Sequence, residues 1–257
     1  MFDLEQIREQ TPVGHIDFHH QIGSTNDRGI DLINEGLNST PTLILTENQT
    51  AGRGQRGHKW WSSQGSLTFS YIFPIDNRSF NPIPIALAVA EAIETATPLR
   101  SLKIKWPNDI LFENRKISGI LIETVTRPQQ TLVVAGIGIN VNNASIIPQD
   151  LEQLDDRGDK SNLLRPTSIR GETKSDTSMT ELLIQIINRI EHVPRSHEQI
   201  FDKINHRLAF RDKRVSVKSS SGNFTGICEQ ISTSGQLIIR CDDGSKKKIF
   251  SGSIHAI

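Results

Sequence analysis

Glycines alternate with cations in Gly52-Arg53-Gly54-Gln55-Arg56-Gly57-His58-Lys59-Trp60-Trp61, a stretch that ends in two tryptophans. Apolar, β-branched runs lie on both sides of it, at 41–46 and 66–73. The second run alternates apolar and polar residues with period two, which is typical of a strand. The stretch is therefore predicted to be a loop that joins two strands.

This glycine-cation loop, residues 52–61, has the composition of an anion site. Glycine lets the backbone approach a ligand closely, and successive N–H groups of such a loop can form an anion-binding concavity. Arg53 and Arg56 add donors that suit phosphate or carboxylate. A dinucleotide fold requires a helix after the third glycine, and a P-loop requires Gly-Lys-Ser/Thr; neither is present. Taken alone, the loop fits a solvated basic segment equally well.

Length and composition restrict the classes of protein. The chain has 257 residues, which predicts one large domain or a main domain with a small one. The formal net charge is +0, so no overall basic field attracts nucleic acid or a membrane surface. Cys228 and Cys241 are the only cysteines, which excludes a disulfide framework and fits a reducing compartment. We expect a cytoplasmic protein without signal peptide or membrane span.

The remaining chain shows alternating strand and helix patterns. Strands are predicted at 15–19, 102–106, 110–112, 116–124 and 132–141, and helices from 24, 83, 178 and about 200. A turn is predicted at 21–23. Residues 142–176 are polar and predict a long loop, in which 149–152 favour a turn of helix. From Arg211 on, short strands separated by turns predict a small all-β barrel.

Several of these elements carry features that suit a ligand. Ser24-Thr25-Asn26 begins a helix, where it serves as a cap alone or as a polar-ligand site as well. Gly119 interrupts a strand, which indicates a bulge or a close ligand. Gly136 and Gly138 leave one strand face bare, either for helix packing or as a floor beneath a ligand. Lys116 lies near a predicted hairpin turn.

Five motifs together resemble those of biotin–protein ligases, in that family's order. They are Ser24-Thr25-Asn26, Gln49 to Gly57, Lys105 to Asp109, Lys116 to Leu121, and Gly136 to Val141. Each is weak alone, but the ordered set is highly specific and covers nearly the whole chain from about His15. The resemblance implies an α+β fold: a mixed, mostly antiparallel sheet with helices, as in class II synthetase-like biotin and lipoate ligases, plus a C-terminal SH3-like β-barrel. We expect a catalytic domain at 1–208 and the SH3-like domain at 209–257.

The same resemblance implies an ATP-dependent, AMP-forming biotin–[acetyl-CoA-carboxylase] ligase. Such an enzyme makes biotinyl-5′-AMP and transfers biotin to a lysine of the biotin carboxyl carrier protein of acetyl-CoA carboxylase. ATP and Mg²⁺ are the implied cofactors, and the chain is expected to be a monomer or homodimer that binds no nucleic acid. The family's N-terminal helix-turn-helix is not expected here, so the chain resembles the ligase-only type.

Site residues follow from the matched motifs. Because two anions must meet, Arg53 and Lys116 are implied as catalytic residues on the biotin carboxylate and the α-phosphate. The implied biotin site contains Ser24, Thr25, Asn26, Gln49, Gly52, Arg53, Gly54, Gln55, Lys116, Gly119, Gly136 and Gly138. The implied ATP site contains Arg53, Arg56, Trp60, Asn108, Lys116 and Asn140, and Asp109 is the implied metal ligand.

Some positions depart from the family pattern. Gln55 stands where many members carry Arg, and His58 stands where Arg is frequent. Residues 142–165 contain no tryptophan, whereas some members place an aromatic side chain over adenine there. Two alternatives remain: a lipoate–protein ligase-like acyl-adenylate transferase, and a non-catalytic binding module whose barrel docks a partner. The glycine-cation loop and the Trp106-Pro107-Asn108-Asp109 turn favour biotin.

Overall fold

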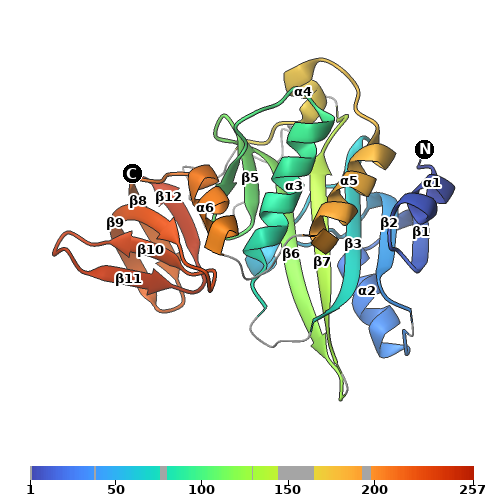
Figure 1. The fold of residues 1–257 in the computed structure, drawn as a ribbon, viewed down its shortest axis with the longest axis horizontal. Helices are drawn as coiled ribbons and strands as arrows, with labels where there is room; N and C mark the ends of the chain where they lie inside the picture. Colours follow the sequence, from blue (N-terminus) through green and yellow to red (C-terminus); the bar gives the residue numbers. More distant parts are fainter. Residues whose placement is uncertain (1, 38, 76–79, 129, 144–164, 193–197) are drawn as a thin grey trace.

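The computed structural model describes residues 2–37, 39–75, 80–128, 130–143, 165–192 and 198–257. Its larger part is a seven-stranded sheet in the order β1-β2-β3-β7-β6-β5-β4 (Figure 1). The strands are β1 (His15–Ile22), β2 (Thr42–Gln49), β3 (Ser66–Ile75), β4 (Lys103–Lys105), β5 (Asp109–Phe112), β6 (Arg115–Thr126) and β7 (Thr131–Asn140). β1 and β2 are parallel, and the other pairs of this sheet are antiparallel. The predicted α+β class with a mostly antiparallel sheet is confirmed.

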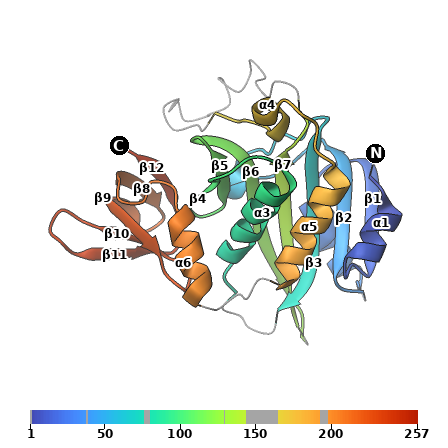
Figure 2. The same ribbon diagram turned by 45° about the horizontal axis from the view of Figure 1, so that its top comes forward.

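The two faces of the sheet differ because side chains alternate across it. On one face, Tyr71 and Val133 belong to a core that includes α3 (Ile83–Ala96) and α5 (Met179–His192), which lie side by side in Figure 2. On the other face, Ile72 and Val134 pack with α2 (Thr25–Asn34). Gly136 and Gly138 have the same parity as Val134, so they lie on the α2 face.

Helix boundaries follow local capping rules. α1 (Leu4–Gln10) begins after Asp3, whose side chain accepts a hydrogen bond from the amide of Gln6. The amide of Glu181 donates to Ser178 Oγ at 3.3 Å, so Ser178 caps the start of α5, the helix predicted from 178. Among the described residues, no helix has the length and apolar character needed to span a membrane.

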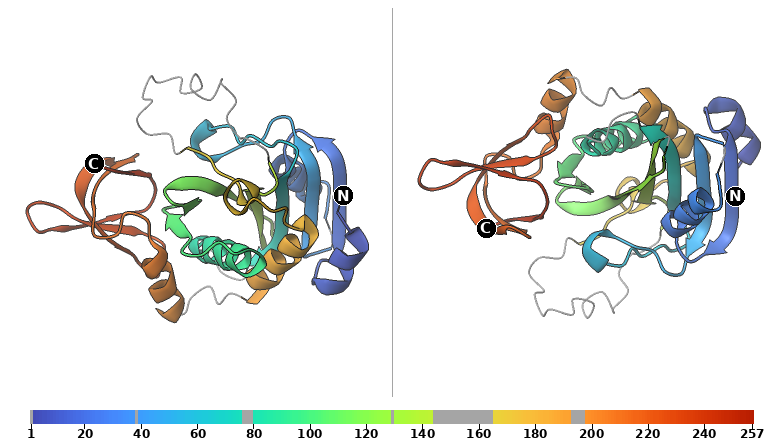
Figure 3. Two further views of the ribbon diagram at one scale, coloured as in Figure 1. Left: turned by 90° about the horizontal axis from the view of Figure 1, so that it is seen from above. Right: turned by 90° about the horizontal axis from the view of Figure 1, so that it is seen from below.

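A second sheet lies at the end of the molecule opposite α1 and β1 (Figure 3). It contains β8 (Arg214–Ser219), β9 (Gly222–Ile231), β10 (Leu237–Arg240), β11 (Lys246–Ile249) and β12 (Ser253–Ala256), in the order β11-β10-β9-β8-β12. This confirms the small all-β unit. β12 was not predicted, because its four residues form a strand only through pairing with β8, where Ile254 lies opposite Val217.

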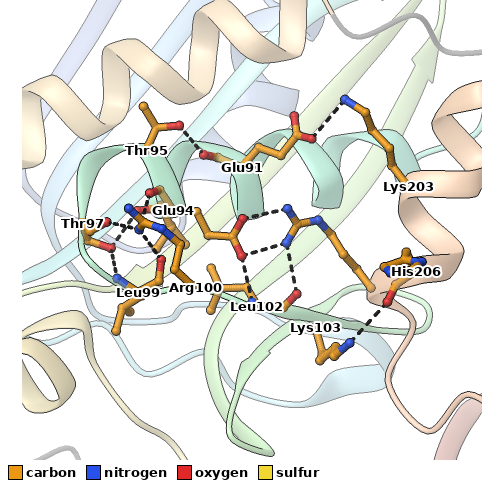
Figure 4. A network of polar contacts seen from close by, with 12 residues as sticks. Glu91, Glu94, Thr95, Thr97, Leu99, Arg100, Leu102, Lys103, Lys203 and His206 are labelled. Atoms are coloured by element: carbon orange, nitrogen blue, oxygen red, sulfur yellow. Dashed lines mark hydrogen bonds and ion pairs between the residues drawn. The ribbon is translucent and has the colours of Figure 1, made fainter.

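Polar contacts hold α6 (Glu198–Arg207), just before the small sheet, against the larger sheet's core. Arg207 donates to both carboxylate oxygens of Glu94 on α3, at 2.8 and 2.7 Å. Glu94 Oε1 also accepts from the amide of Leu102, 2.9 Å away, just before β4 (Figure 4). This bidentate ion pair joins α6 to α3, and the bond from Leu102 ties the start of β4 to the same carboxylate.

Two further predictions are corrected. The turn expected at 21–23 begins later, because β1 continues to Ile22 and pairs with Gln49 of β2. The long loop expected at 142–176 contains α4 (Ile169–Thr173), capped by Ser168. The helical turn favoured at 149–152 lies outside the described residues. α6 ends at Arg207 and β8 begins at Arg214; the domain boundary at 208/209 stays a prediction.

Candidate active site

The first group of predicted site residues lies at the start of α2. Ser24, Thr25 and Asn26 are each less than 5% exposed. Both the amide and the hydroxyl of Thr25 donate to Gln49 Oε1, at 2.7 and 3.0 Å. The end of β2 thus joins the start of α2, as the motifs implied.

Ser70 belongs to this group, although none of the five sequence motifs contains it. Its Oγ lies 2.7 Å from Thr25 Oγ1 and 2.6 Å from Asn26 Oδ1, and the side chain is fully buried. The signal in the sequence was weak, since an alternating strand places many polar residues on one face. Only the packing of α2 over β3 shows that Ser70 orients two helix-start side chains.

Arg53 is held between two carboxylates. Its Nη2 lies 2.6 Å from Asp27 Oδ1 and 2.7 Å from Glu123 Oε2. Glu123 Oε2 also accepts from Asn26 Nδ2, 2.8 Å away, so the arginine is tied to the helix start. The hydrogen bond to Glu123 raises the pKa of Arg53 above its ordinary value, so the guanidinium stays charged. No sequence motif indicates that Asp27 and Glu123 are its partners.

The glycine-cation loop connects β2 and β3, as predicted, and closes on itself. The amides of Gly54 and Trp60 donate to the carbonyls of His58 and Gly52, at 2.6 and 2.9 Å. A short 3₁₀ turn, η1 (Gln55–Gly57), lies at its tip, and Arg56 there has a left-handed backbone with φ 57°. Two backbone N–H groups of the loop are therefore bonded within the loop. The predicted anion-binding concavity would need such groups to point toward a ligand.

Three glycines form the floor of the site on the α2 face. Gly119 of β6 lies opposite Gly138 of β7 in the sheet register. A Cβ on Gly138 would lie 2.2 Å from Trp60 Cε2, and a Cβ on Gly136 would lie 2.1 Å from Asn26 Oδ1. Real Cβ atoms do not approach so closely, so these positions require glycine while the side chains lie above them. The bare strand face is therefore covered by motif side chains, with Asn26 of α2 over Gly136 and Trp60 of the loop over Gly138.

Trp60 reaches this floor from the glycine-cation loop. It crosses above Gly138, and a Cβ on Gly119 would lie 3.1 Å from its Cζ3. Its buried indole N–H has no hydrogen-bond partner among the described residues. A buried donor without a partner is costly, so this atom fits a site that receives a polar ligand.

Lys116 lies beside Trp60 and above Gly119. Its Nζ is 2.5 Å from Asp109 Oδ1 and 5.6 Å from the centre of the Trp60 ring. The turn at 113–115 and the strands β5 and β6 place it there, as the hairpin pattern predicted. Loop and hairpin thus bring a cation, an aromatic ring and a carboxylate together over the glycine floor.

Two asparagine side chains that are predicted to bind ATP donate hydrogen bonds to backbone carbonyls at this site. Asn108 Nδ2 donates to the carbonyl of Ile120 at 2.9 Å, and Asn140 Nδ2 donates to the carbonyl of Thr167 at 3.0 Å. These bonds pin the turn before β5 and the end of β7. The side-chain oxygens of both residues remain acceptors, and their role toward ATP stays a prediction.

A metal site is not formed by the described side chains. Asp109 is the predicted ligand, yet its Oδ1 is paired with the Lys116 ammonium. Among the described residues, no three His, Cys, Asp or Glu side chains cluster closely enough to hold an ion. Mg²⁺ prefers several oxygen ligands, so this donor set does not by itself fit the ion.

Sequence comparisons agree with this geometry. The model of the Biotin/lipoate A/B protein ligase family matches residues 18–142, and that of the Biotin protein ligase C terminal domain matches 212–255. The bifunctional ligase/repressor BirA of Bacillus subtilis (strain 168) is 28% identical over 264 residues, covering 93% of this chain and 73% of that protein. A biotin–[acetyl-CoA-carboxylase] ligase of Mycobacterium tuberculosis is 26% identical over 245 residues, covering 92% and 86%.

A solved structure extends the likeness to the fold. The biotin protein ligase from Aquifex aeolicus in complex with biotin and ATP is 28% identical, with a TM-score of 0.77. The likeness covers 95% of this chain and 100% of that one. With both family models matched in order and the five motifs assembled at one site, the chain belongs to the Biotin/lipoate A/B protein ligase family and carries the biotin protein ligase C-terminal domain.

Proposed function

We propose that this protein activates biotin with ATP to biotinyl-5′-AMP and transfers the biotinyl group to a lysine of a carrier protein. The observation that supports this most is that Lys116 lies over Gly119 while Arg53 shares Glu123 with Asn26, which lies over Gly136 at the buried polar group of α2. An acid with a polar head and a carboxylate tail would fit that arrangement, with its head toward Thr25 and Asn26.

The first step joins two anions. A carboxylate oxygen of biotin attacks the α-phosphorus, a C–O–P link forms, and pyrophosphate leaves with the electrons of the broken P–O bond. Arg53 and Lys116 would reduce the repulsion between the reactants and stabilise the charge that develops on the phosphate oxygens. To do so, Arg53 must turn from Asp27 and Glu123, and Lys116 from Asp109.

The second step transfers the acyl group. The neutral amine of the acceptor lysine attacks the carbonyl carbon, AMP leaves with the bonding electrons, and the amine loses a proton as the amide forms. No covalent enzyme intermediate is needed, so the protein contributes position and charge. Trp60 and the glycine-cation loop would exclude water from the mixed anhydride.

Magnesium is proposed to enter with ATP, bound by phosphate oxygens. Asp109 as a ligand remains a prediction, because in this structure its oxygen is bound by Lys116. The carrier is proposed to be the biotin carboxyl carrier protein of acetyl-CoA carboxylase, as the name of the Mycobacterium tuberculosis relative suggests. Cytoplasmic location, a monomer or homodimer, and no binding of DNA also stay predictions.

The test is acid-dependent exchange of pyrophosphate into ATP. We expect exchange with biotin and little with lipoate, because the polar group around Thr25 and Asn26 offers partners to a ureido ring that lipoate lacks. A preference for lipoate would favour the lipoate ligase alternative, and no exchange with either acid would favour the binding module. Omission of Mg²⁺ from the assay is expected to abolish exchange.

A further inference from the structure

Lys105 is a buried cation at the site that the proposed steps do not use. It is 7% exposed, whereas Lys103 on the same strand is exposed and donates to the carbonyl of His206 at 3.2 Å. Burial lowers the pKa of Lys105, Asp109 counteracts part of this effect, and Lys116 adds to it. A buried ammonium is unfavourable unless an opposite charge compensates it, so the position needs an explanation.

The sheet register explains which charges Lys105 faces. Lys105 lies directly opposite Asp109 in the β4–β5 pair, and Asp109 lies opposite Gly119 in the β5–β6 pair. Directly opposite residues share a face with their Cβ atoms about 5 Å apart. The row therefore contains one carboxylate between two ammonium groups, Lys105 from β4 and Lys116 above Gly119.

The position of Lys105 in this row becomes important when the Lys116 ammonium moves from Asp109 to the substrate. Asp109 is 16% exposed at its side chain, and its Oδ1 is buried. If Lys116 were its sole counter-charge, departure of Lys116 would leave a mostly buried carboxylate unpaired, which is strongly unfavourable. A second ammonium on the same face removes that obstacle.

We propose that Lys105 is a positioning residue: it is the counter-charge that Asp109 keeps when Lys116 moves to the carboxylate and α-phosphate. The inference rests on the proposed function, because it assigns Lys105 a task in adenylate formation. Lys105 touches no reacting atom in this scheme and acts through Asp109. The competing explanation is that Lys105 merely fills space beside β5.

The first experiment compares charge with shape. Lys105→Met keeps about the length of the side chain and removes its charge, whereas Lys105→Arg keeps the charge. Lys103→Met is the matched control on the same strand. We expect Lys105→Met to lower kcat for biotin-dependent pyrophosphate exchange about tenfold, within the range of couplings between groups of one charge network. The KM for biotin should stay within about threefold of wild type, because the biotin contacts lie elsewhere. Lys103→Met should match wild type, and Lys105→Arg should be faster than Lys105→Met.

The second experiment is a double-mutant cycle with Asp109→Asn. Without the carboxylate no counter-charge is needed, so Lys105→Met should cost much less rate in the Asp109→Asn background than in wild type. Thermal unfolding accompanies each variant. Lys105→Met should unfold at the wild-type temperature or above, because an apolar chain replaces a buried ammonium. If it does not fold, Lys105→Gln takes its place in the cycle.

The outcomes test the positioning role of Lys105 separately from the proposed adenylate formation. A Lys105→Met kcat within about twofold of wild type, or an additive cycle, overturns the positioning role. So does a Lys105→Arg variant as slow as Lys105→Met in a folded chain. Absence of exchange in wild type overturns the proposed function itself, whatever the Lys105 variants do.

Discussion

Each of the two cations proposed for catalysis is tied to carboxylates in this structure. Arg53 contacts Asp27 and Glu123, and Lys116 contacts Asp109. The arginine pair is partly exposed, so solvent screens it and the bonds are worth about 1 kcal/mol or less each. The Lys116 pair is more buried, so its exchange for a substrate anion needs compensation from neighbouring charge. Substrate binding at this site is thus an exchange of ion pairs.

Lys116→Ala should abolish adenylate formation and leave the fold intact. Loss of one group that stabilises developing charge lowers kcat by about two to three orders of magnitude. The measurement is biotin-dependent pyrophosphate exchange, with Lys103→Ala as a control for loss of a lysine. Near-normal exchange in a folded Lys116→Ala protein would remove Lys116 from the catalytic role.

At the scale of the element, β7 and the glycine-cation loop fit each other. Gly138 and Gly136 provide the flat strand surface, and the loop places Trp60 on it. Gly52 belongs to the same arrangement, since a Cβ there would lie 2.4 Å from the carbonyl oxygen of Trp60. The loop therefore depends on glycine at two places: at Gly52, where it begins, and on β7, against which Trp60 packs.

Gly138→Ala should displace Trp60 and weaken biotin binding at least about tenfold, with a smaller effect on folding. The new methyl group would overlap the indole ring, and an exposed loop yields more easily than a strand in the middle of a sheet. Tryptophan fluorescence and biotin titration measure the two effects. Gly23→Ala is the control, because a Cβ at Gly23 meets nothing within 4 Å. Wild-type affinity in Gly138→Ala would show that this floor does not contact biotin.

Gln55→Arg should lengthen the half-life of the enzyme-bound adenylate. Gln55 lines a cavity of about 550 Å³ together with Pro107, Asn108 and Ile120, next to the turn that carries Asp109. A guanidinium at this loop tip adds a charge-assisted bond to the adenylate phosphate, roughly twice as strong as a neutral one. The decay of bound biotinyl-5′-AMP without carrier is measured, with Gln64→Arg as the control in the same connection. An equal or shorter half-life in Gln55→Arg contradicts the prediction.

On the scale of the whole molecule, the small sheet shares its core with the larger one. Trp106 is 1% exposed and belongs to the cluster that also contains Val217 and Ile254. Its Nε1 donates to the carbonyl of Gly235 at 3.0 Å, in the turn before β10. The next residues along the chain are Pro107, Asn108 and Asp109, so the C-terminal sheet supports the turn that leads into the site.

Trp106→Phe should lower stability and slow adenylate formation more than it weakens biotin binding. The change leaves the Gly235 carbonyl without its partner and creates a small cavity, which costs about 1–3 kcal/mol. Chemical denaturation, biotin titration and pyrophosphate exchange are compared in one preparation. Trp61→Phe is the control, since Trp61 is 53% exposed. Equal losses in biotin binding and exchange would show that the junction does not act through the turn.

Much of the fold followed from local pattern. Alternation marked β3, β6 and β7, helical spacing and capping residues marked α3 and α5, and turn residues marked the small sheet. Two of the elements that local pattern missed, β12 and α4, are only four and five residues long. Such short elements depend on a partner for stability, because few residues cannot offset the cost of ordering the chain.

The sequence by itself determined the strand-loop-strand setting of Gly52 to Trp61, the hairpin that carries Lys116 and the bare strand face at Gly136 and Gly138. These features follow from local propensity and from period two, which neighbouring residues encode. Only the tertiary structure decided that Ser70 orients the start of α2, that Asp27 and Glu123 hold Arg53, and that Lys105 faces Asp109. Those contacts join residues far apart in the chain, and their partners are set by strand register and helix packing, which no single segment specifies.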